Sequence, residues 1–308
     1  MLSGIPIPKD AVRPPETVLV NITPQETRVA VLEENNICEL HIERNSGHSL
    51  VGNIYLGVVR RVLPGMQSAF IDIGLERAAF LHIVDVLEQR RNPDETQRIE
   101  HMLFEGQSVL VQVIKDPINT KGARLSTQIS LAGRFLVHLP QEDHIGISQR
   151  IEDDAERNSL RERLTNLLPE DACHGYIIRT NAENATDEQL LSDIHYLTKV
   201  WEHIQEQAKT QPPETLLYQD LPLSLRVLRD MFSLDTQKIL VDSTENHRRM
   251  TRFAEQYVHG ALGKIELFKG ERPLFETHNV EQEISRALQP RVNLNFGSYL
   301  IIESTEAM

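Results

Sequence analysis

The sequence contains few of the residues on which several protein classes depend. Only two of its 308 residues are cysteine, Cys38 and Cys173, so no disulfide framework can be built. The run ICELHI puts Cys38 on the same side as Leu40 and Ile42, and we expect it to be a small buried hydrophobic residue. The twelve histidines show no zinc-like spacing, so we assign no metal ligand among them. This cysteine usage fits a reducing, cytoplasmic compartment.

Long hydrophobic runs are also missing. No stretch approaches the ~20 apolar residues of a membrane-spanning helix, so we expect no membrane partner. The N-terminal MLSGIPIPKDAVRPPE is rich in proline and lacks the apolar core of a signal peptide. Residues 1–16 are therefore expected to form a flexible extension. A chain of this length has room for two or three domains.

The chain lacks the basic excess that favours nucleic-acid binding, since its net charge is −13. The acidity is not spread evenly. Between Ser49 and Phe135, ten lysine and arginine residues face nine acidic residues, so this region carries +1 and the rest carries −14. The middle region is thus the part most compatible with a nucleic-acid partner, although mixed charge is common on protein surfaces.

The most informative segment lies in that middle region, at residues 52–82, and reads GNIYLGVVRRVLPGMQSAFIDIGLERAAFLH. Its alternation and turn residues predict three short antiparallel strands, the second over residues 68–73 and the third from about Ala79. Phe70 and Phe80 then lie on successive strands. Exposed aromatic rings beside arginines suit single-stranded nucleic acid, because bases stack on rings and phosphates attract cations. The competing interpretation is that both are core residues, the usual position of phenylalanine in a strand.

The rest of the chain divides into three patterns. Five short strands with polar loops indicate an OB-type barrel, interrupted by a polar insertion at residues 88–100. Helical spacing of apolar residues follows, and then an α/β alternation from about Leu216. The further predicted strands are residues 18–22, 28–32, 37–42, 108–114, 123–130, 134–139, 175–180, 238–242, 264–268 and 298–303. The predicted helices are residues 154–168, one from about 187, 223–232, 246–258 and 280–288.

Six segments occur in one order along residues 18–308: NITPQETRVAVLE, residues 52–82, VIKDPINTKGARLSTQISL, GISQRIE, GYIIRT and SYLIIESTEAM. Together they resemble the ribonuclease E/G family of bacterial endoribonucleases, and its ribonuclease G members most closely. So many ordered segments make chance a poor explanation. The resemblance also favours RNA contact over core packing for Phe70 and Phe80.

The resemblance implies an α+β multidomain architecture, in which an OB-fold RNA-binding barrel is inserted in an RNase H-like α/β subdomain. A 5′-sensor subdomain and the start of a DNase I-like catalytic subdomain follow. The implied function is the single-stranded RNA-binding and 5′-monophosphate-sensing portion of an endoribonuclease of rRNA maturation and mRNA decay. The implied bounds are 17–48 and 214–284 for the RNase H-like subdomain, 49–130 for the barrel, 131–213 for the sensor and 285–308 for the catalytic start.

The resemblance also implies which residues contact RNA. In the family the OB domain closes over single-stranded RNA, and its contacting residues map to Phe70, Phe80 and Lys121. A stacked base contributes about 1–3 kcal/mol, and a lysine adds a salt-sensitive phosphate contact. Judged by spacing alone, Lys121 would instead be a solvated loop lysine.

A pocket for a 5′-monophosphate maps to Arg179 and Thr180, and in the family backbone groups near Gly133 and Val137 complete it. A guanidinium holds a phosphate through two hydrogen bonds, and an adjacent hydroxyl adds a directional donor. A 5′-triphosphate would overfill such a pocket. Arg150 is a secondary candidate, for which a surface or ion-paired position is the ordinary alternative.

The sequence departs from the family at several positions. Leu56 stands where lysine is common, and Asn181 stands where a small residue follows the Arg-Thr pair. In the family, TEAM at residues 305–308 precedes an Asp-hydrophobic-Asn motif whose Asp binds magnesium, and a second Asp follows later. Neither is present here, nor is the cysteine motif that shares zinc between subunits. We therefore assign no catalytic or metal-binding residue, and expect this chain to bind RNA without cutting it, with Mg²⁺ and a homodimer belonging to the full-length enzyme.

Two other functions compete with this one. The first is a non-catalytic RNA-binding adaptor that ends naturally at Met308, which the reading frame beyond that codon would distinguish from a truncated enzyme. The second is a structural α/β protein whose barrel binds another protein. Binding of a 5′-monophosphorylated oligonucleotide would separate the RNA-binding functions from this last one.

Overall fold

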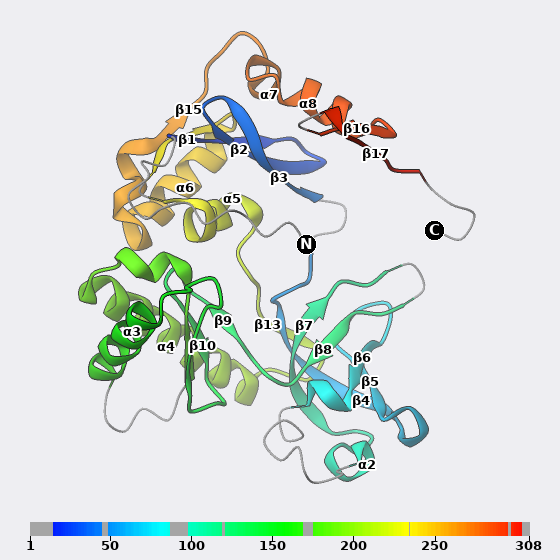
Figure 1. The fold of residues 1–308 in the computed structure, drawn as a ribbon. Coiled ribbons are helices and arrows are strands. Elements are labelled where there is room, and N and C mark those ends of the chain that lie inside the picture. Colours follow the sequence, from blue (N-terminus) through cyan, green and yellow to red (C-terminus); the bar gives the residue numbers. More distant parts are fainter. Residues whose placement is uncertain are drawn as a thin grey trace. The chain divides into compact units, whose positions relative to one another are not determined.

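The computed structural model describes residues 15–44, 49–86, 98–118, 121–168, 175–233, 235–294 and 297–303. These residues form a mixed α+β structure that divides into two compact units, each described here by itself (Figure 1). Unit 1 comprises Met1–His48 and Leu221–Met308, and unit 2 comprises Ser49–Asp220. Most of the expected extension, most of the polar insertion and Cys173 lie outside the described residues.

Unit 1 is built on a five-stranded mixed sheet with the strand order β15-β14-β1-β2-β3. The strands predicted over residues 28–32 and 37–42 pair as a hairpin, and its turn residues Glu34 and Asn35 both have positive φ, the backbone that a tight two-residue hairpin requires. β1 pairs antiparallel with β2 and parallel with β14. The strands are β1 (Glu16–Ile22), β2 (Glu26–Glu33), β3 (Asn36–Arg44), β14 (Thr236–Val241) and β15 (Ile265–Leu267).

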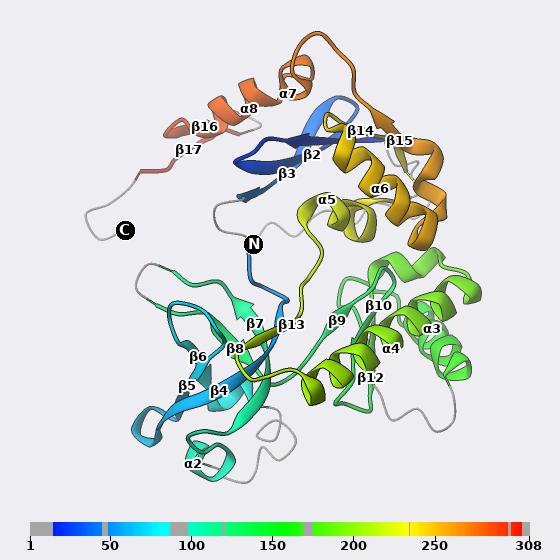
Figure 2. The same cartoon turned by 180° about the vertical axis from the view of Figure 1, so that it is seen from behind.

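Helices cover both faces of the unit 1 sheet (Figures 1 and 2). In β1, Val18 and Val20 join the core beneath α5 and α6, whereas Leu19 joins the core beneath α7 and α8, as the twofold period of a strand requires. The predicted helix over residues 223–232 begins as α5 and continues as a π-helical turn. The elements are α5 (Leu223–Arg226), the π-helical turn (Val227–Met231), α6 (Thr244–Tyr257), α7 (Leu274–Thr277), α8 (Val280–Ala287), β16 (Arg291–Asn293) and β17 (Tyr299–Ile301).

The expected burial of Cys38 is wrong, because this residue is exposed. It lies on β3, the edge strand of the sheet, which has a neighbouring strand on one side only. The core beneath α7 and α8 reaches β3 only at Ile37. Leu40 and Ile42, on the same strand, are 38% and 51% exposed. Alternation correctly grouped Cys38 with Leu40 and Ile42, but nothing among the described residues covers that part of the strand.

Unit 2 contains a closed five-stranded barrel, consistent with an OB-like fold. The barrel closes because β4 pairs with β5 along its second half and with β7 along its first half. The strand predicted over residues 123–130 is shorter, because the Thr127 N–H donates to the Asp85 carbonyl in a loop. The elements are β4 (Ile54–Leu63), β5 (Ser68–Asp72), β6 (Ala79–His82), α2 (Ile99–Met102), β7 (Ser108–Lys115), β8 (Arg124–Ser126) and β13 (Thr215–Tyr218), the last pairing with β4.

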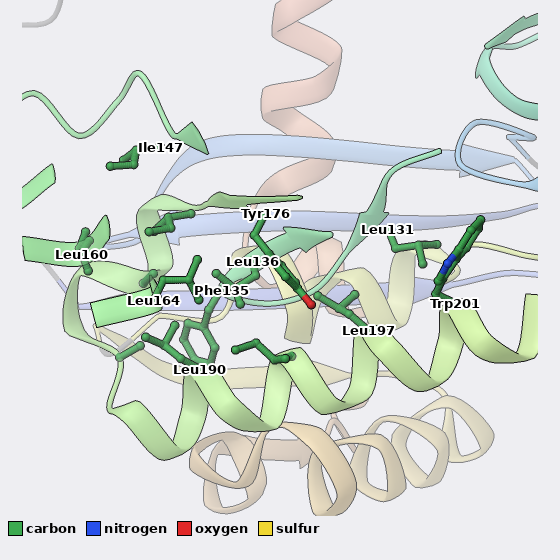
Figure 3. Close-up of a cluster of buried hydrophobic side chains, with 14 of the residues drawn as sticks. Leu131, Phe135, Leu136, Ile147, Leu160, Leu164, Tyr176, Leu190, Leu197 and Trp201 are labelled. Carbon is green, nitrogen blue, oxygen red and sulfur yellow. The ribbon is translucent and has the colours of Figure 1, made fainter. Parts of the chain in front are cut away.

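Unit 2 also contains a four-stranded sheet that packs against two helices. Figure 3 shows Leu190, Leu197 and Trp201 of α4 facing the strands, which confirms the predicted apolar stripe. A capping box between Thr186 and Gln189 starts this helix. No helix among the described ranges has the apolar length to cross a membrane. The elements are β9 (Leu131–Ala132), β10 (Leu136–Leu139), β11 (Ile145–Ile147), α3 (Asp154–Leu167), β12 (Gly175–Ile178) and α4 (Asp187–Thr210).

Candidate nucleic-acid interface

Phe70 and Phe80 lie on the outer surface of the barrel. They face one another across the antiparallel pair β5–β6, with ring centroids 6.2 Å apart and ring planes inclined at 66°. Their neighbours Ala69, Ile71 and Leu81 are fully buried in the barrel core, and side chains alternate along a strand. Both rings are partly exposed and neither belongs to that core. The core interpretation of these residues is therefore wrong.

Cationic residues extend this pair across the sheet. Strand pairing sets Arg61 of β4 opposite Phe70, and Arg124 of β8 opposite Phe80. Lys115 of β7 lies opposite Arg124 in turn. We call these five residues the aromatic row: a cation, two aromatic rings and two further cations. Stacking surfaces beside cations are the elements that single-stranded nucleic acid requires.

Acidic partners compensate some of the positive charge near the aromatic row. The Arg124 guanidinium lies 2.8 Å from the carboxylate of buried Asp85. Arg60, next to the row on β4, pairs with Asp72 at 3.0 Å and with Glu214 at 2.5 Å. Ion pairs of this kind hold long side chains in place while lowering the local potential. The row is thus moderately positive, in keeping with the near-neutral charge of this region of the sequence.

Lys121 lies at the end of the barrel loop that leads into β8. Ile118 and Lys121 exchange backbone hydrogen bonds of 3.2 and 2.9 Å, and the Lys121 side chain is exposed. A Cβ at the next residue, Gly122, would collide with the Ala78 carbonyl oxygen, so only glycine lets this loop approach the start of β6. The Phe80 N–H then donates to the Ala123 carbonyl at 2.7 Å. The structure thus brings Lys121 to the part of β6 that carries Phe80.

The second group of predicted residues lies on the four-stranded sheet or next to the ends of its strands. Arg179 follows β12, and its Nη1 donates to the Gly133 carbonyl at 2.5 Å. Its backbone N–H donates to the Phe135 carbonyl at 2.9 Å. Thr180 is the next residue and is partly exposed. Val137 lies on β10, paired with residues of β12 and β9. The structure therefore brings Arg179 and Gly133 into direct contact.

Asp193 of α4 is part of the same arrangement, although the sequence reasoning did not select it. Its carboxylate accepts hydrogen bonds from the backbone N–H groups of Arg134, Phe135 and Leu136, at 3.2, 2.8 and 2.9 Å. Burial raises the pKa of this carboxyl, while the three N–H groups and the charge of Arg179 act in the opposite direction. The sequence contains one signal for Asp193: it lies three residues after Leu190, on the face of the helix that carries the apolar stripe.

Two arginines complete the description of the predicted positions. Arg150 is exposed in the turn between β11 and α3, where its N–H donates to the Ser148 hydroxyl at 3.3 Å. The Ser148 N–H donates to the Ile178 carbonyl at 2.8 Å, so this turn flanks the residue before Arg179. Arg124, in contrast, was missed. Its alternation with buried Leu125 could have indicated an outward side chain, but not its position opposite Phe80.

Comparison with known proteins agrees with the family that the sequence segments resemble. The model of the Ribonuclease E/G family matches residues 130–308. Ribonuclease G of Salmonella typhimurium (strain SL1344) is 44% identical over 298 residues, and that of Escherichia coli (strain K12) is 43% identical. Each alignment covers 94% of this chain but only 60% of the relative. Ribonuclease E of Nostoc sp. (strain PCC 7120) is 38% identical over 291 residues, covering 93% of this chain and 42% of that protein. The chain therefore belongs to the ribonuclease E/G family.

Proposed function

We propose that this chain is the single-stranded RNA-binding and 5′-monophosphate-sensing portion of a ribonuclease G-like endoribonuclease. The observation that carries the proposal is the outward pair Phe70–Phe80 at the centre of the aromatic row. Two rings and their flanking cations accept consecutive bases and phosphates without reading sequence. Lys121 lies in the loop that approaches the start of β6, close to Phe80 in that strand, and adds a further phosphate contact.

The 5′-phosphate pocket is proposed around Arg179 and Thr180. The contact between Arg179 and the Gly133 carbonyl supports it, because a hydrogen bond from Nη1 restricts the direction in which the guanidinium points. The Thr180 hydroxyl and backbone groups at Gly133 and Val137 would complete the pocket. A 5′-monophosphate carries the charge that such a pocket accepts, and a triphosphate exceeds its size.

Unit 1 is proposed to combine an RNase H-like subdomain with the first residues of a DNase I-like one. The support is a sheet in which antiparallel β1, β2 and β3 adjoin parallel β14 and β15, with helices on both faces. The chain spans about 60% of the ribonuclease G relatives. For the complete enzyme we propose homodimeric, Mg²⁺-dependent cleavage of RNA in rRNA maturation and mRNA decay in the cytoplasm.

A magnesium site is not assigned within this chain. Within the ranges that the structure describes, no three His, Cys, Asp or Glu side chains are grouped to hold a metal ion. We propose that the 308-residue chain binds RNA without cutting it. Magnesium-dependent product from purified protein, absent from a mock purification, would contradict this.

Fluorescence anisotropy tests the two binding sites together. One single-stranded RNA, labelled at its 3′ end, is prepared with a 5′-monophosphate and with a 5′-hydroxyl. We expect the wild-type chain to prefer the monophosphate by about tenfold, the factor of one charge-assisted hydrogen bond, and Arg179→Ala to remove the preference. Arg161→Ala, which removes an exposed arginine of α3, is the control and should keep it. A wild-type chain that binds neither RNA would contradict the proposed function.

A further inference from the structure

The turn between β9 and β10 is held from α4 by a carboxylate. Three successive N–H groups, of Arg134, Phe135 and Leu136, all point at Asp193. Successive backbone N–H groups that converge in this way form an anion-binding concavity, which is here occupied by a side chain of the protein itself. Residues 133–136 are called the sensor turn below.

Gly133 allows the carboxylate to come this close. A Cβ at Gly133 would lie 2.5 Å from Asp193 Oδ2 and 2.7 Å from Oδ1, so any larger residue would push the sensor turn and the carboxylate apart. The Gly133 N–H donates to the Leu136 carbonyl at 2.8 Å, which closes the turn on itself. The position therefore requires glycine in order to bring the carboxylate and the turn together.

The carbonyl groups of the same turn accept hydrogen bonds from Arg179. The Gly133 carbonyl accepts from its Nη1, and the Phe135 carbonyl accepts from its backbone N–H. The N–H groups of the sensor turn thus bind Asp193 while its carbonyl groups bind Arg179. A displacement of the turn on one side changes the direction of the guanidinium on the other.

We infer that Asp193 is a positioning residue for the 5′-phosphate pocket, acting on Arg179 through the sensor turn. This inference rests on the proposed function, because it assigns a role within the pocket proposed above. The carboxylate need not touch RNA. Its charge holds three N–H groups in place, so that the Gly133 carbonyl meets Arg179 and the guanidinium is already directed when a phosphate arrives.

The test uses Asp193→Asn, which keeps the side-chain shape but replaces one acceptor oxygen by an amide group facing backbone donors. The measured quantity is the ratio of Kd for 5′-hydroxyl RNA to Kd for 5′-monophosphate RNA of the same sequence, in the full 308-residue chain. Glu188→Gln makes the same charge change at an exposed position of the same helix and is the matched control. Arg179→Ala and the double variant complete the set.

We expect Asp193→Asn to lower the ratio of the two Kd values by about tenfold, to a ratio close to that of the Arg179→Ala chain. The Kd for 5′-hydroxyl RNA should stay unchanged within about twofold. The double variant should be no lower than Arg179→Ala alone, because both changes act on one pocket. Asp193→Glu, which restores the charge, should recover part of the ratio.

Two results would overturn the inference. One is an Asp193→Asn chain that keeps the wild-type ratio while Arg179→Ala loses it. The other is an Asp193→Asn chain that loses affinity for both RNAs alike, since this would show a merely structural residue. A wild-type ratio near one, unaffected by Arg179→Ala, would instead refute the proposed 5′-phosphate pocket, and the inference with it.

Discussion

The aromatic row and the sensor turn belong to the same unit but are built in opposite ways. The row is a surface: Phe70 and Phe80 emerge from the barrel because strand residues alternate, their rings lie against one another, and strand pairing places Arg61 and Arg124 beside them. The sensor turn is a network, in which Arg179 and Asp193 are linked through backbone groups of four residues. The row exposes aromatic area to a ligand, whereas the sensor turn fixes the direction of a guanidinium.

This difference follows from the two ligands that we propose. A base presents a flat apolar face, so stacking tolerates many sequences and needs little more than an accessible ring. A terminal phosphate is compact and charged, and its recognition depends on donors held at fixed angles. Substitutions in the aromatic row should therefore lower RNA affinity in proportion to the aromatic area removed. Substitutions that displace any member of the sensor-turn network should instead lower the preference for a 5′-monophosphate.

The largest effect is expected where both regions share a core. Trp201 of α4 packs in the cluster that also contains Ile54 of the barrel strand β4. Trp201→Ala should lower the free energy of unfolding by about 3–5 kcal/mol, since it empties a large buried volume. Urea denaturation measures this loss. Leu288→Ala, at a position 79% exposed in unit 1, should change it by less than about 0.5 kcal/mol. If Trp201→Ala lowers the free energy of unfolding as little as Leu288→Ala does, Trp201 does not stabilise unit 2.

A smaller but more specific loss is expected in the aromatic row. Phe70→Ala should weaken RNA binding by about 1–3 kcal/mol, through the loss of one stacking surface, whether the 5′ end carries phosphate or hydroxyl. Phe104→Ala is the matched control, because Phe104 is also an exposed phenylalanine of unit 2, at 67%, but lies outside the row. Anisotropy titrations with both RNAs decide the matter. If Phe104→Ala costs as much affinity as Phe70→Ala, the row has no special role.

Lys121 should contribute mainly through salt-dependent attraction. Lys121→Ala should weaken binding several-fold at low salt, and should reduce the slope of log K against log[salt] by about 0.7, the value for one phosphate contact to single-stranded nucleic acid. Titrations at four salt concentrations give the slope. Lys199→Ala, an exposed lysine of α4, should leave the slope unchanged. A slope that also stays constant in Lys121→Ala would remove this residue from the interface.

The smallest effect concerns pH and the sensor turn. Burial raises the pKa of the Asp193 carboxyl above 3.8, so over the interval up to that raised pKa the folded chain keeps a proton that the unfolded chain has lost. Rising pH therefore favours the unfolded state across this interval. The stability advantage of the wild type over Asp193→Asn should shrink as pH rises from about 4 through the raised pKa, and then stay constant. Urea midpoints of the two chains at matched pH values test this, and an advantage that grows with pH would contradict it.

Local patterns predicted much of this structure. The twofold alternation of residues 52–82 gave the strands that carry Phe70 and Phe80, because a strand period is a property of neighbouring residues. The same alternation failed for Cys38, since it defines a side of a strand but not whether another element covers that side. Whether the rings faced solvent was decided by closure of the barrel, which depends on distant segments.

The parts of the site that the sequence missed all depend on long-range contacts. Arg124 lies opposite Phe80 only because β8 pairs with β6, and Asp193 reaches the Phe135 N–H from 58 residues away. A single sequence contains no signal for such pairings. The roles of Arg179, Thr180 and Lys121 came from the family resemblance and stay predictions. The structure adds the hydrogen bonds of Arg179 and of the Lys121 backbone.

The most direct test of the separation between the two regions is a double-mutant cycle on 5′-monophosphate RNA with Phe70→Ala and Arg179→Ala. Phe70 lies on a barrel strand and Arg179 follows a strand of the other sheet, so their losses in binding free energy should add within about 0.5 kcal/mol. On 5′-hydroxyl RNA only Phe70→Ala should have an effect. A strong coupling between the two changes, or an equal loss from Arg179→Ala on both RNAs, would contradict a stacking surface and a phosphate pocket that act independently.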